Sequence, residues 1–277
     1  MSTELTQTYR SLLADKVRLA EPLEDLRATY RAAQPFPHLV LDGMFSTRLL
    51  DAVIAEMSDM TTAQWSIIDK DARERTLRMR SVAEMGPAGT ELLGIVHSAA
   101  FLYFLSEITG VWQLLPDPYL LGGGYASMRR SDYFGVHSDR SVAYDTGLVR
   151  RLAMIIFLNK EWDPAYAGQL ELWNHEATRC EASVDPLYNR TVVFEVANPN
   201  FHGVPAPLMC PADRMRRSFI VYYHTAGVSE KTSVRPHSSI FAPRLHGSNR
   251  LTLKALVREV TPPALLRAVR KLRESVR

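Results

Sequence analysis

The spacing of hydrophobic and polar positions changes near residue 116. Before that point, apolar residues recur every three or four positions among charged ones, as at Leu12, Leu13 and Val17. This period is typical of amphipathic helices. It predicts helices over residues 3–33, 45–60 and 89–113, with a Pro-rich breaker and a short strand over residues 35–42.

After Pro116, short β-type runs alternate with turn signals such as Gly122-Gly-Gly and Asp163-Pro. Many short strands with turns between them are typical of a sandwich or a double-sheet jelly roll. We therefore predict a mainly β protein, with a helical support region and entry strand over 1–115, a jelly-roll core over 116–225 and a basic extension over 226–277. No linker separates these parts, so we expect one domain. The predicted core strands are 120–128, 133–137, 151–158, 169–173, 191–196 and 218–223.

Composition narrows the class of protein. The chain has 277 residues, 46% of them apolar and 23% charged, which is ordinary for a globular protein and excludes a disordered chain, a collagen-like fibre or a coiled coil. Two cysteines are too few for a disulfide framework or a thiolate zinc cluster. The N-terminus lacks a signal peptide pattern, and the longest wholly apolar run, residues 152–158, is too short to span a membrane. We expect a cytoplasmic protein with no membrane partner.

Charge is uneven along the chain. The net charge is +3, yet residues 244–277 hold nine Lys or Arg and two Glu, a net of +7. Such a tail could bind nucleic acid or an anionic surface. Apolar residues recur at helical spacing within 251–258 and 264–273, and no aromatic residue interleaves with the charges. We therefore favour a solvated amphipathic helix, and consider nucleic acid an unlikely partner.

Two histidines and one aspartate form the candidate chemistry. His137 and Asp139 are two residues apart at the end of a predicted strand, where alternate side chains point to the same face. His202 follows another predicted strand and could join them. Two imidazoles and one carboxylate occupy one face of an octahedral ion and leave three positions open, which suits Fe(II) that binds a cosubstrate and dioxygen.

Arg216 and Ser218 form a second candidate site. They begin the last predicted core strand and share one face of it. A guanidinium fork beside a hydroxyl matches the geometry of a carboxylate. The pair could therefore grip the far carboxylate of a dicarboxylic acid whose other end chelates the metal.

In order and spacing, these motifs resemble those of the Fe(II)/2-oxoglutarate-dependent oxygenase superfamily, and they are most similar to its prolyl-hydroxylase-like branch. The H-x-D triplet stands at 137–139, the distal histidine at 202 and the R-x-S motif at 216–218, and the resemblance covers about residues 35–225. Ala167 replaces the first glycine of the family's usual pair. Relatives often place a tyrosine nine or ten residues before the first ligand, where this chain has Met128 nine before it. That role could fall to Tyr125 or Tyr133.

The resemblance implies a double-stranded β-helix whose catalytic metal ligands are His137, Asp139 and His202, with Fe(II), 2-oxoglutarate and O2 as cofactor and cosubstrates. Arg216 and Ser218 would then bind 2-oxoglutarate. The implied reaction converts 2-oxoglutarate to succinate and CO2 while an unactivated C–H bond is hydroxylated. Related halogenases lack the carboxylate, so Asp139 favours hydroxylation over halogenation.

Three functions stay open at this point. The first is hydroxylation of a small molecule, such as an amino acid that is free or tethered to a carrier. The second is hydroxylation of a prolyl residue in a peptide or protein. The third is a non-catalytic jelly roll that binds a metal or a sugar. The sequence does not decide the oligomeric state.

Several further residues are weaker candidates. A basic run before the core is predicted as a solvated loop, with a lid that grips an anionic substrate as the alternative; it contains Arg73, Arg75, Arg78 and Arg80. Arg140 follows the H-x-D triplet and could face the substrate, although a surface position is favoured. The segment around Phe241 is a candidate cover for the site. Four other histidines could compete as metal ligands: His175, His224, His237 and His246.

Overall fold

The fold was analysed in a computed structural model of the chain. It describes residues 3–14, 16–19, 21–70, 73–79, 81–142, 146–197, 199–226 and 239–242. The predicted C-terminal helices lie outside the described residues, as do Arg80, His237 and His246. The described α-helices are α1 (Thr3–Ala14), α2 (Leu23–Ala32), α3 (Thr47–Asp59), α4 (Pro87–Val96) and α5 (Ala99–Thr109), with short 3₁₀ helices at Thr62–Gln64, Val82–Glu84 and Pro164–Tyr166.

The helices lie close to their predicted positions, but two of the predicted helices are each broken in two. The first ends at Ala14, and α2 begins after Pro22, which stands at its N-cap. The second breaks at Ser98, whose side chain accepts a hydrogen bond from Phe101 N (3.2 Å) and so caps α5. Gly110 ends α5 with φ +76°, a conformation that glycine adopts without strain. At Ser98, local capping chemistry thus overrides the continuous apolar period.

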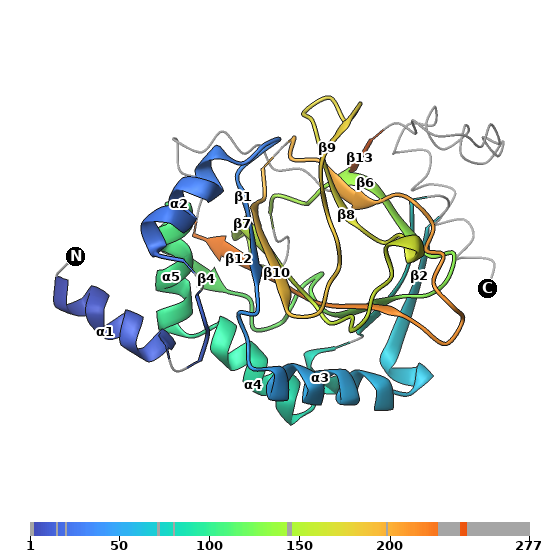
Figure 1. Ribbon diagram of the computed structural model, residues 1–277, viewed down its shortest axis with the longest axis horizontal. Helices are drawn as coiled ribbons and strands as arrows, with labels where there is room; N and C mark the ends of the chain where they lie inside the picture. Colours follow the sequence, from blue (N-terminus) through green and yellow to red (C-terminus); the bar gives the residue numbers. More distant parts are fainter. Residues whose placement is uncertain are drawn as a thin grey trace, which may run out of the picture. The chain divides into compact units, whose positions relative to one another are not determined.

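The strands of the described residues join into one strongly curved antiparallel sheet (Figure 1). Its order is β1-β10-β7-β12-β5-β3-β6-β11-β8-β9, with β2 on β3, β4 on β12 and β13 on β6. The predicted jelly-roll fold is confirmed. The strands are β1 (His38–Asp42), β2 (Trp65–Lys70), β3 (Glu74–Met79), β4 (Leu115–Pro116), β5 (Gly124–Met128), β6 (Tyr133–Ser138), β7 (Val149–Phe157), β8 (Leu170–Trp173), β9 (Cys180–Val184), β10 (Arg190–Glu195), β11 (His202–Val204), β12 (Arg216–Thr225) and β13 (Ile240–Phe241).

The prediction of a loop at the basic run was wrong, because most of the run forms strand β3. Arg75 and Arg78 lie within that strand, which forms a hairpin with β2. Its C-terminal half pairs with β5 and its N-terminal half with β6, so β3 links the two halves of the curved sheet. Ladder hydrogen bonds on both edges stabilise this strand in spite of its charge. Neither the hairpin nor its position in the sheet follows from the local pattern.

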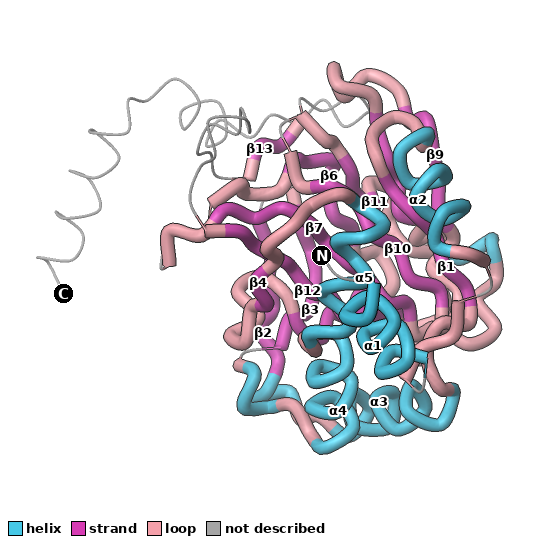
Figure 2. The backbone as a smooth tube through the Cα atoms, turned by 90° about the vertical axis from the view of Figure 1, so that its left-hand side faces the viewer, coloured by secondary structure: helices cyan, strands magenta, loops and turns pink. Residues whose placement is uncertain are grey.

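Strict alternation along the central strands separates two apolar layers. On β12, Phe219, Val221 and Tyr223 pack in the core that the helices cover, whereas Ile220 and Tyr222 pack on the opposite, concave face. The strand β7 alternates in the same way. Figure 2 shows α1, α3, α4 and α5 gathered on one side of the strands. The helices therefore support the outer face of the sheet and leave its inner face for a cavity.

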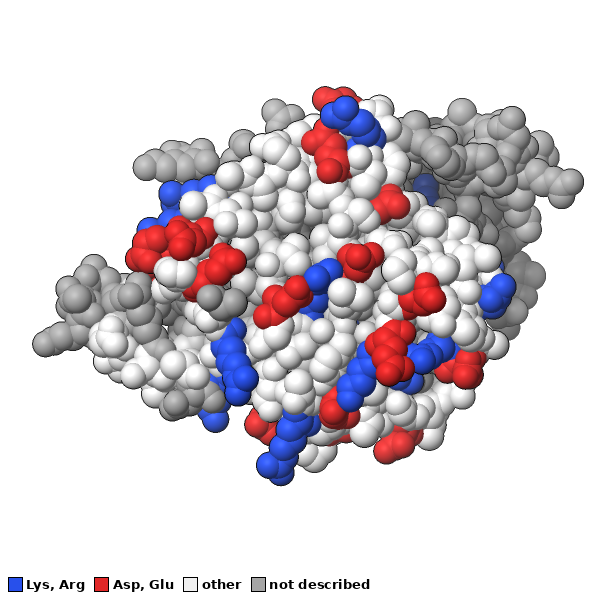
Figure 3. All heavy atoms as spheres, in the orientation of Figure 1, with Lys and Arg blue, Asp and Glu red and all other residues white. Residues whose placement is uncertain are grey.

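Two further observations concern surfaces. On the face drawn in Figure 3, basic and acidic side chains of the described residues lie interspersed. Within the part of the chain that is described, no single helix has the length and apolar composition to cross a membrane; α4 and α5 together would, with a bend of 49° between them. The apolar side chains of this pair contribute to the core under the sheet.

Candidate active site

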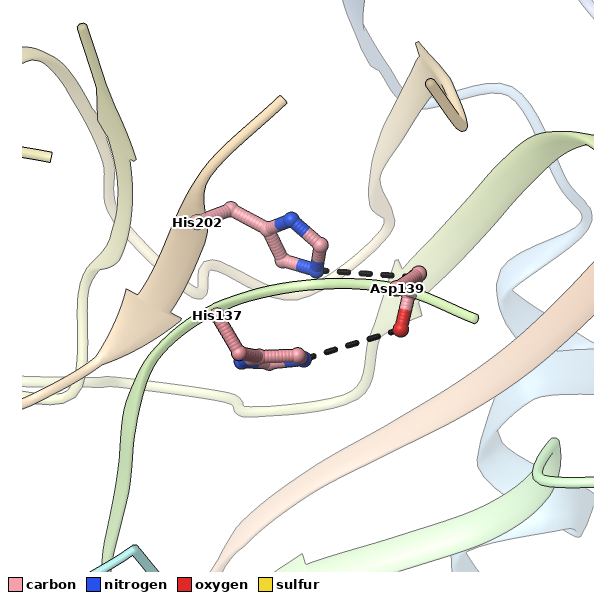
Figure 4. A group of neighbouring side chains, drawn as sticks. All are labelled: His137, Asp139 and His202. Atoms are coloured by element: carbon pink, nitrogen blue, oxygen red, sulfur yellow. Dashed lines mark ion pairs between the residues drawn. The ribbon is translucent and has the colours of Figure 1, made fainter. Parts of the chain in front are cut away.

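Two neighbouring strands place His137, Asp139 and His202 together. His137 on β6 lies directly opposite His202 on β11 in the antiparallel register, and Asp139 follows β6 on the same face as His137. The Nε2 atoms of His137 and His202 each lie 3.6 Å from one oxygen of Asp139 (Figure 4). One ligand atom from each residue lies within 4.8 Å of the others. The structure thus brings together the three residues that the spacing singled out.

Backbone contacts orient both imidazoles toward the aspartate. His137 Nδ1 lies 2.9 Å from Gly135 O, and His202 Nδ1 lies 3.3 Å from Asn200 O. A carbonyl oxygen only accepts hydrogen bonds, so Nδ1 carries the proton in each ring. Each Nε2 is then left with a lone pair that faces Asp139. This is the arrangement in which a backbone contact fixes the tautomer of a metal-binding histidine.

The electrostatics of the three residues fit a cation. Burial, with a smaller electrostatic contribution from His137, lowers the pKa of His202 to about 4, so the ring is neutral at pH 7. Burial acts to raise the pKa of Asp139, but the facing imidazoles outweigh it, so the pKa lies below its ordinary value. Asp139 Oδ2 is buried and has no hydrogen-bond partner among the described residues. Distances of 3.6 Å are too long for hydrogen bonds, so two lone pairs and a carboxylate converge where a divalent metal would satisfy them.

Tyr222 contacts the aspartate, and Arg150 packs on Tyr222. The Tyr222 hydroxyl donates to Asp139 Oδ1 at 3.4 Å. The Arg150 guanidinium lies 3.6 Å from the centroid of the Tyr222 ring and donates to Leu121 O at 2.7 Å. This arrangement restricts the orientation of the carboxylate. Sequence reasoning missed both residues, although alternation from Arg216 along the same strand places Tyr222 on the inner face.

Arg216 and Ser218 lie on the inner face of β12 and line the same cavity as the three ligands. Arg216 is only 5% exposed, and none of the carboxylates in the described part of the chain forms an ion pair with it. Its Nε donates to Gly168 O at 2.6 Å, and its guanidinium lies over the ring of Phe157. A side chain at Gly168 would crowd it, because a Cβ there would lie 3.1 Å from Arg216 Cδ.

The charge of Arg216 is unsatisfied in the free protein. Burial, and then the nearby charge of Arg78, lower the pKa of Arg216 to about 9, and the group stays charged at pH 7. A buried guanidinium without an acidic partner is costly unless an anion binds it. The cavity therefore pairs a metal-binding set with an anion-binding group.

The cavity walls between these groups are mainly apolar. Aromatic rings flank the first ligand: Phe134 stacks on His137 with centroids 4.0 Å apart, and Phe241 on β13 lies 5.4 Å away. The cavity is lined by Thr76, Arg78, Ala126, Met128, Phe134, His137, Asp139, Ala153, Ile155, Leu170, Phe194, His202, Gly203, Val204, Arg216, Ser218, Ile220 and Tyr222. These walls exclude water and so strengthen the polar contacts inside.

Four of the weaker candidates are placed as follows. Tyr125 faces the helical core, where its hydroxyl donates to Glu56 Oε2 at 3.0 Å, so the structure does not bring it to the cavity. Ala126 and Met128 face inward in its place. Tyr133 and Arg140 are half-buried and absent from the described cavity lining, whereas Arg78 lines it.

The two competing histidines within the described residues lie apart from the three ligands. His175 is exposed in the turn after β8. His224 lies near the end of β12, opposite Leu115 of β4, and is buried. Burial lowers the pKa of His224 to about 4. In the described part of the chain, His137, Asp139 and His202 form the one group with metal-binding geometry.

A comparison with protein families gives a match over the core strands of the chain. Residues 123–224 match the family described as the 2OG-Fe(II) oxygenase superfamily. No curated protein matches the chain. The matched segment contains all three ligand residues, Arg216 and Ser218, and it confirms the resemblance stated from the motifs.

Solved structures share the fold at low sequence identity. A Pseudomonas putida prolyl-4-hydroxylase is 18% identical, with a TM-score of 0.53 over 73% of this chain and 100% of that one. A Trichoplax adhaerens prolyl hydroxylase, solved with a hypoxia inducible factor peptide fragment, is 14% identical, with a TM-score of 0.54 over 81% and 94%. HygX from Streptomyces hygroscopicus, solved with nickel and 2-oxoglutarate, is 11% identical, with a TM-score of 0.51 over 81% and 98%.

Proposed function

From the premise that the chain carries a 2OG-Fe(II) oxygenase domain over residues 123–224, we propose that it hydroxylates an unactivated C–H bond of a small molecule, an amino acid that is free or tethered to a carrier. An oxygenase is an enzyme, so this match excludes the third function left open by the sequence, a non-catalytic jelly roll. The observation that carries the proposal is that His137, Asp139 and His202 line the same cavity as Arg216, which has no ion-pair partner among the described residues. The aromatic cover of Phe134 and Phe241 beside the first ligand favours a small substrate over a long chain.

Each group has a distinct role in this proposal. His137 and His202 would bind Fe(II) through Nε2, and Asp139 through its carboxylate. O2 would be the oxidant and iron would activate it, while 2-oxoglutarate would be oxidised to succinate and CO2. Arg216 and Ser218 would hold the far carboxylate of 2-oxoglutarate. Tyr222 keeps Asp139 oriented, and the apolar walls exclude water from the site.

A second candidate function is prolyl hydroxylation of a peptide. Two of the three solved structures named above are prolyl hydroxylases, and one of them was solved with a peptide fragment. That reading requires a peptide to reach the ligands past Phe241. A peptide library and an amino acid library would therefore separate the two functions.

An anaerobic titration tests the proposed class of chemistry. Addition of Fe(II) and then 2-oxoglutarate to the purified protein should produce a weak visible charge-transfer band, and a His137→Ala variant should not produce it. In air, succinate release should increase with a member of the amino acid library. A wild-type protein that binds neither Fe(II) nor 2-oxoglutarate would refute the proposal, and stimulation by peptides alone would favour the second function.

A further inference from the structure

A second guanidinium faces the cavity from β3. Arg78 and Thr76 both line the cavity, whereas the intervening Leu77 packs in the helical core. In the sheet, Arg78 lies opposite Ala126, and Ala126 lies opposite Ser218. The small side chain of Ala126 leaves room for the long Arg78 side chain beside the residues that would bind the cosubstrate.

The polar contacts of Arg78 leave its guanidinium partly unsatisfied. Its Nη2 lies 3.5 Å from Glu74 Oε1, which is at the limit of a hydrogen bond. Its Nη1 is buried and has no hydrogen-bond partner among the described residues. Glu74 is shared, because it also accepts from the Thr76 hydroxyl at 2.8 Å and lies 3.4 Å from Lys70 Nζ. The guanidinium lies over the ring of Phe134, the ring that stacks on His137.

The cavity holds two guanidinium groups, those of Arg216 and Arg78. The positive charge of Arg78 repels that of Arg216 and so helps to lower the pKa of Arg216. The same charge opposes the rise in the pKa of Tyr222, the residue beside Asp139. Fe(II) carries two positive charges, and Asp139 would balance one of them. Of the two carboxylates of 2-oxoglutarate, one would bind the metal and the other would bind Arg216. Arg78 then remains, with Glu74 as its ion-pair partner at 3.5 Å, a carboxylate that it shares with Thr76 and Lys70. A partly buried guanidinium fork beside the reacting centre is suited to a carboxylate.

We propose that Arg78 binds a carboxylate of the primary substrate, which makes the substrate a free amino acid or a similar small acid. This inference rests on the proposed function and narrows it. An amino acid held as a carrier thioester has no free carboxylate, and neither has a residue inside a peptide. The alternative partner for Arg78 is also a carboxylate, namely the carboxylate of 2-oxoglutarate nearest the metal. The test below distinguishes this carboxylate from that of the substrate.

Binding to the Ni(II)·2-oxoglutarate protein, which does not turn over, tests this by titration calorimetry. The probes are the common amino acids as free acids, the same compounds as α-carboxamides, and a proline-containing peptide with blocked ends. We expect the wild type to bind one free acid at least 10-fold more tightly than its carboxamide. Arg78→Gln should weaken binding of that acid about 10- to 100-fold and leave its carboxamide unchanged. Arg78→Lys, which keeps the charge without the fork, should lie between, and it carries the test if Arg78→Gln does not fold.

Arg75→Gln is the matched control. Arg75 lies on the same strand, outside the described cavity lining, 3.4 Å from Asp69, so this variant should bind every probe as the wild type does. An Arg78→Gln variant that binds 2-oxoglutarate more weakly but the acid equally well would assign Arg78 to the cosubstrate and overturn the proposal. So would equal binding of acid and carboxamide, or no binding of any free acid by a protein that still binds Fe(II) and 2-oxoglutarate. A wild-type protein that binds neither Fe(II) nor 2-oxoglutarate would instead refute the proposed function.

Discussion

Replacement of Arg216 by methionine should remove the ability of the protein to recognise the far carboxylate of 2-oxoglutarate. Methionine fills a similar apolar volume beside Phe157 and carries no charge. Arg216 is 5% exposed and forms no ion pair with the described residues, so solvent does not screen the contact and no protein carboxylate competes for it. Truncation of one partner of a buried, hydrogen-bonded charge pair costs about 2–5 kcal/mol. The dissociation constant of 2-oxoglutarate should therefore rise about 30- to 5,000-fold.

The same substitution should not lower the stability of the ligand-free protein. Burial lowers the pKa of Arg216 to about 9, which means that the folded state disfavours its charge at every pH below that value. Arg216→Met removes this penalty and the repulsion from Arg78, but it loses the hydrogen bond to Gly168 O. The melting temperature without ligand should therefore not fall. A variant that binds poorly and melts no lower than the wild type has lost a binding group, not its fold.

The assay compares two 2-oxo acids by anaerobic titration of the Fe(II) protein. 2-Oxoglutarate has the far carboxylate, and 2-oxobutyrate lacks it. Wild type should prefer 2-oxoglutarate strongly, and Arg216→Met should bind the two acids within a few-fold of each other. Arg217→Met, on the next position and the opposite face of β12, should keep the preference. An unchanged preference in Arg216→Met would place the anion site elsewhere and refute the reasoning, with Arg78 as the next residue to test.

Three other outcomes follow from the structure. Asp139→Ala should abolish Fe(II) binding and substrate-dependent succinate formation, as followed by metal analysis and product assay, and a variant with full turnover would contradict the assigned site. Glu56→Ala should lower the free energy of unfolding by about 2–4 kcal/mol, because it leaves two helix N-terminal amides and a tyrosine hydroxyl without their acceptor; exposed Glu91→Ala should change it by less than about 0.5 kcal/mol. The pKa of His224 is about 4 when folded and 6.5 ordinarily, so the unfolded state binds the proton first and stability falls from pH 6.5 toward pH 4. His224→Gln should remove about 2 kcal/mol of the loss between pH 7 and pH 5 in denaturant titrations. Equal slopes in the wild type and the variant would show that His224 does not titrate as described.

The metal-binding residues could be predicted because most of their geometry is local. His137 and Asp139 are two positions apart in one strand, so alternation alone puts them on one face. Arg216 and Ser218 share the same property on β12. His202 is different, because its position opposite His137 depends on pairing between strands 65 residues apart. That contact was available only through the resemblance to a known family.

The errors have a common physical origin, which is that neighbouring strands set one another's register. Tyr125 was a candidate for the cosubstrate because it precedes His137 at nearly the usual distance. Its strand, however, pairs Met128 with Arg216, and this register turns Met128 inward and Tyr125 outward. A shift of one residue would have exchanged the two faces. No feature within residues 124–128 records that choice.

The basic strand β3 shows the same limit at Arg78, a candidate that the sequence placed in a loop. Four arginines in eight residues favour exposure when they are considered alone, and only the ladders to β5 and β6 make this segment a buried strand. Once it is a strand, alternation separates Arg75 from Arg78, one near Asp69 and the other in the cavity. Two residues of one type, three positions apart, thereby receive different environments. Alternation within one strand was enough to pair His137 with Asp139 and Arg216 with Ser218. The positions of His202, Tyr222 and Arg78 depend instead on what lies across the sheet, so a search for further specificity residues in this chain should follow rows of paired strands and not motifs.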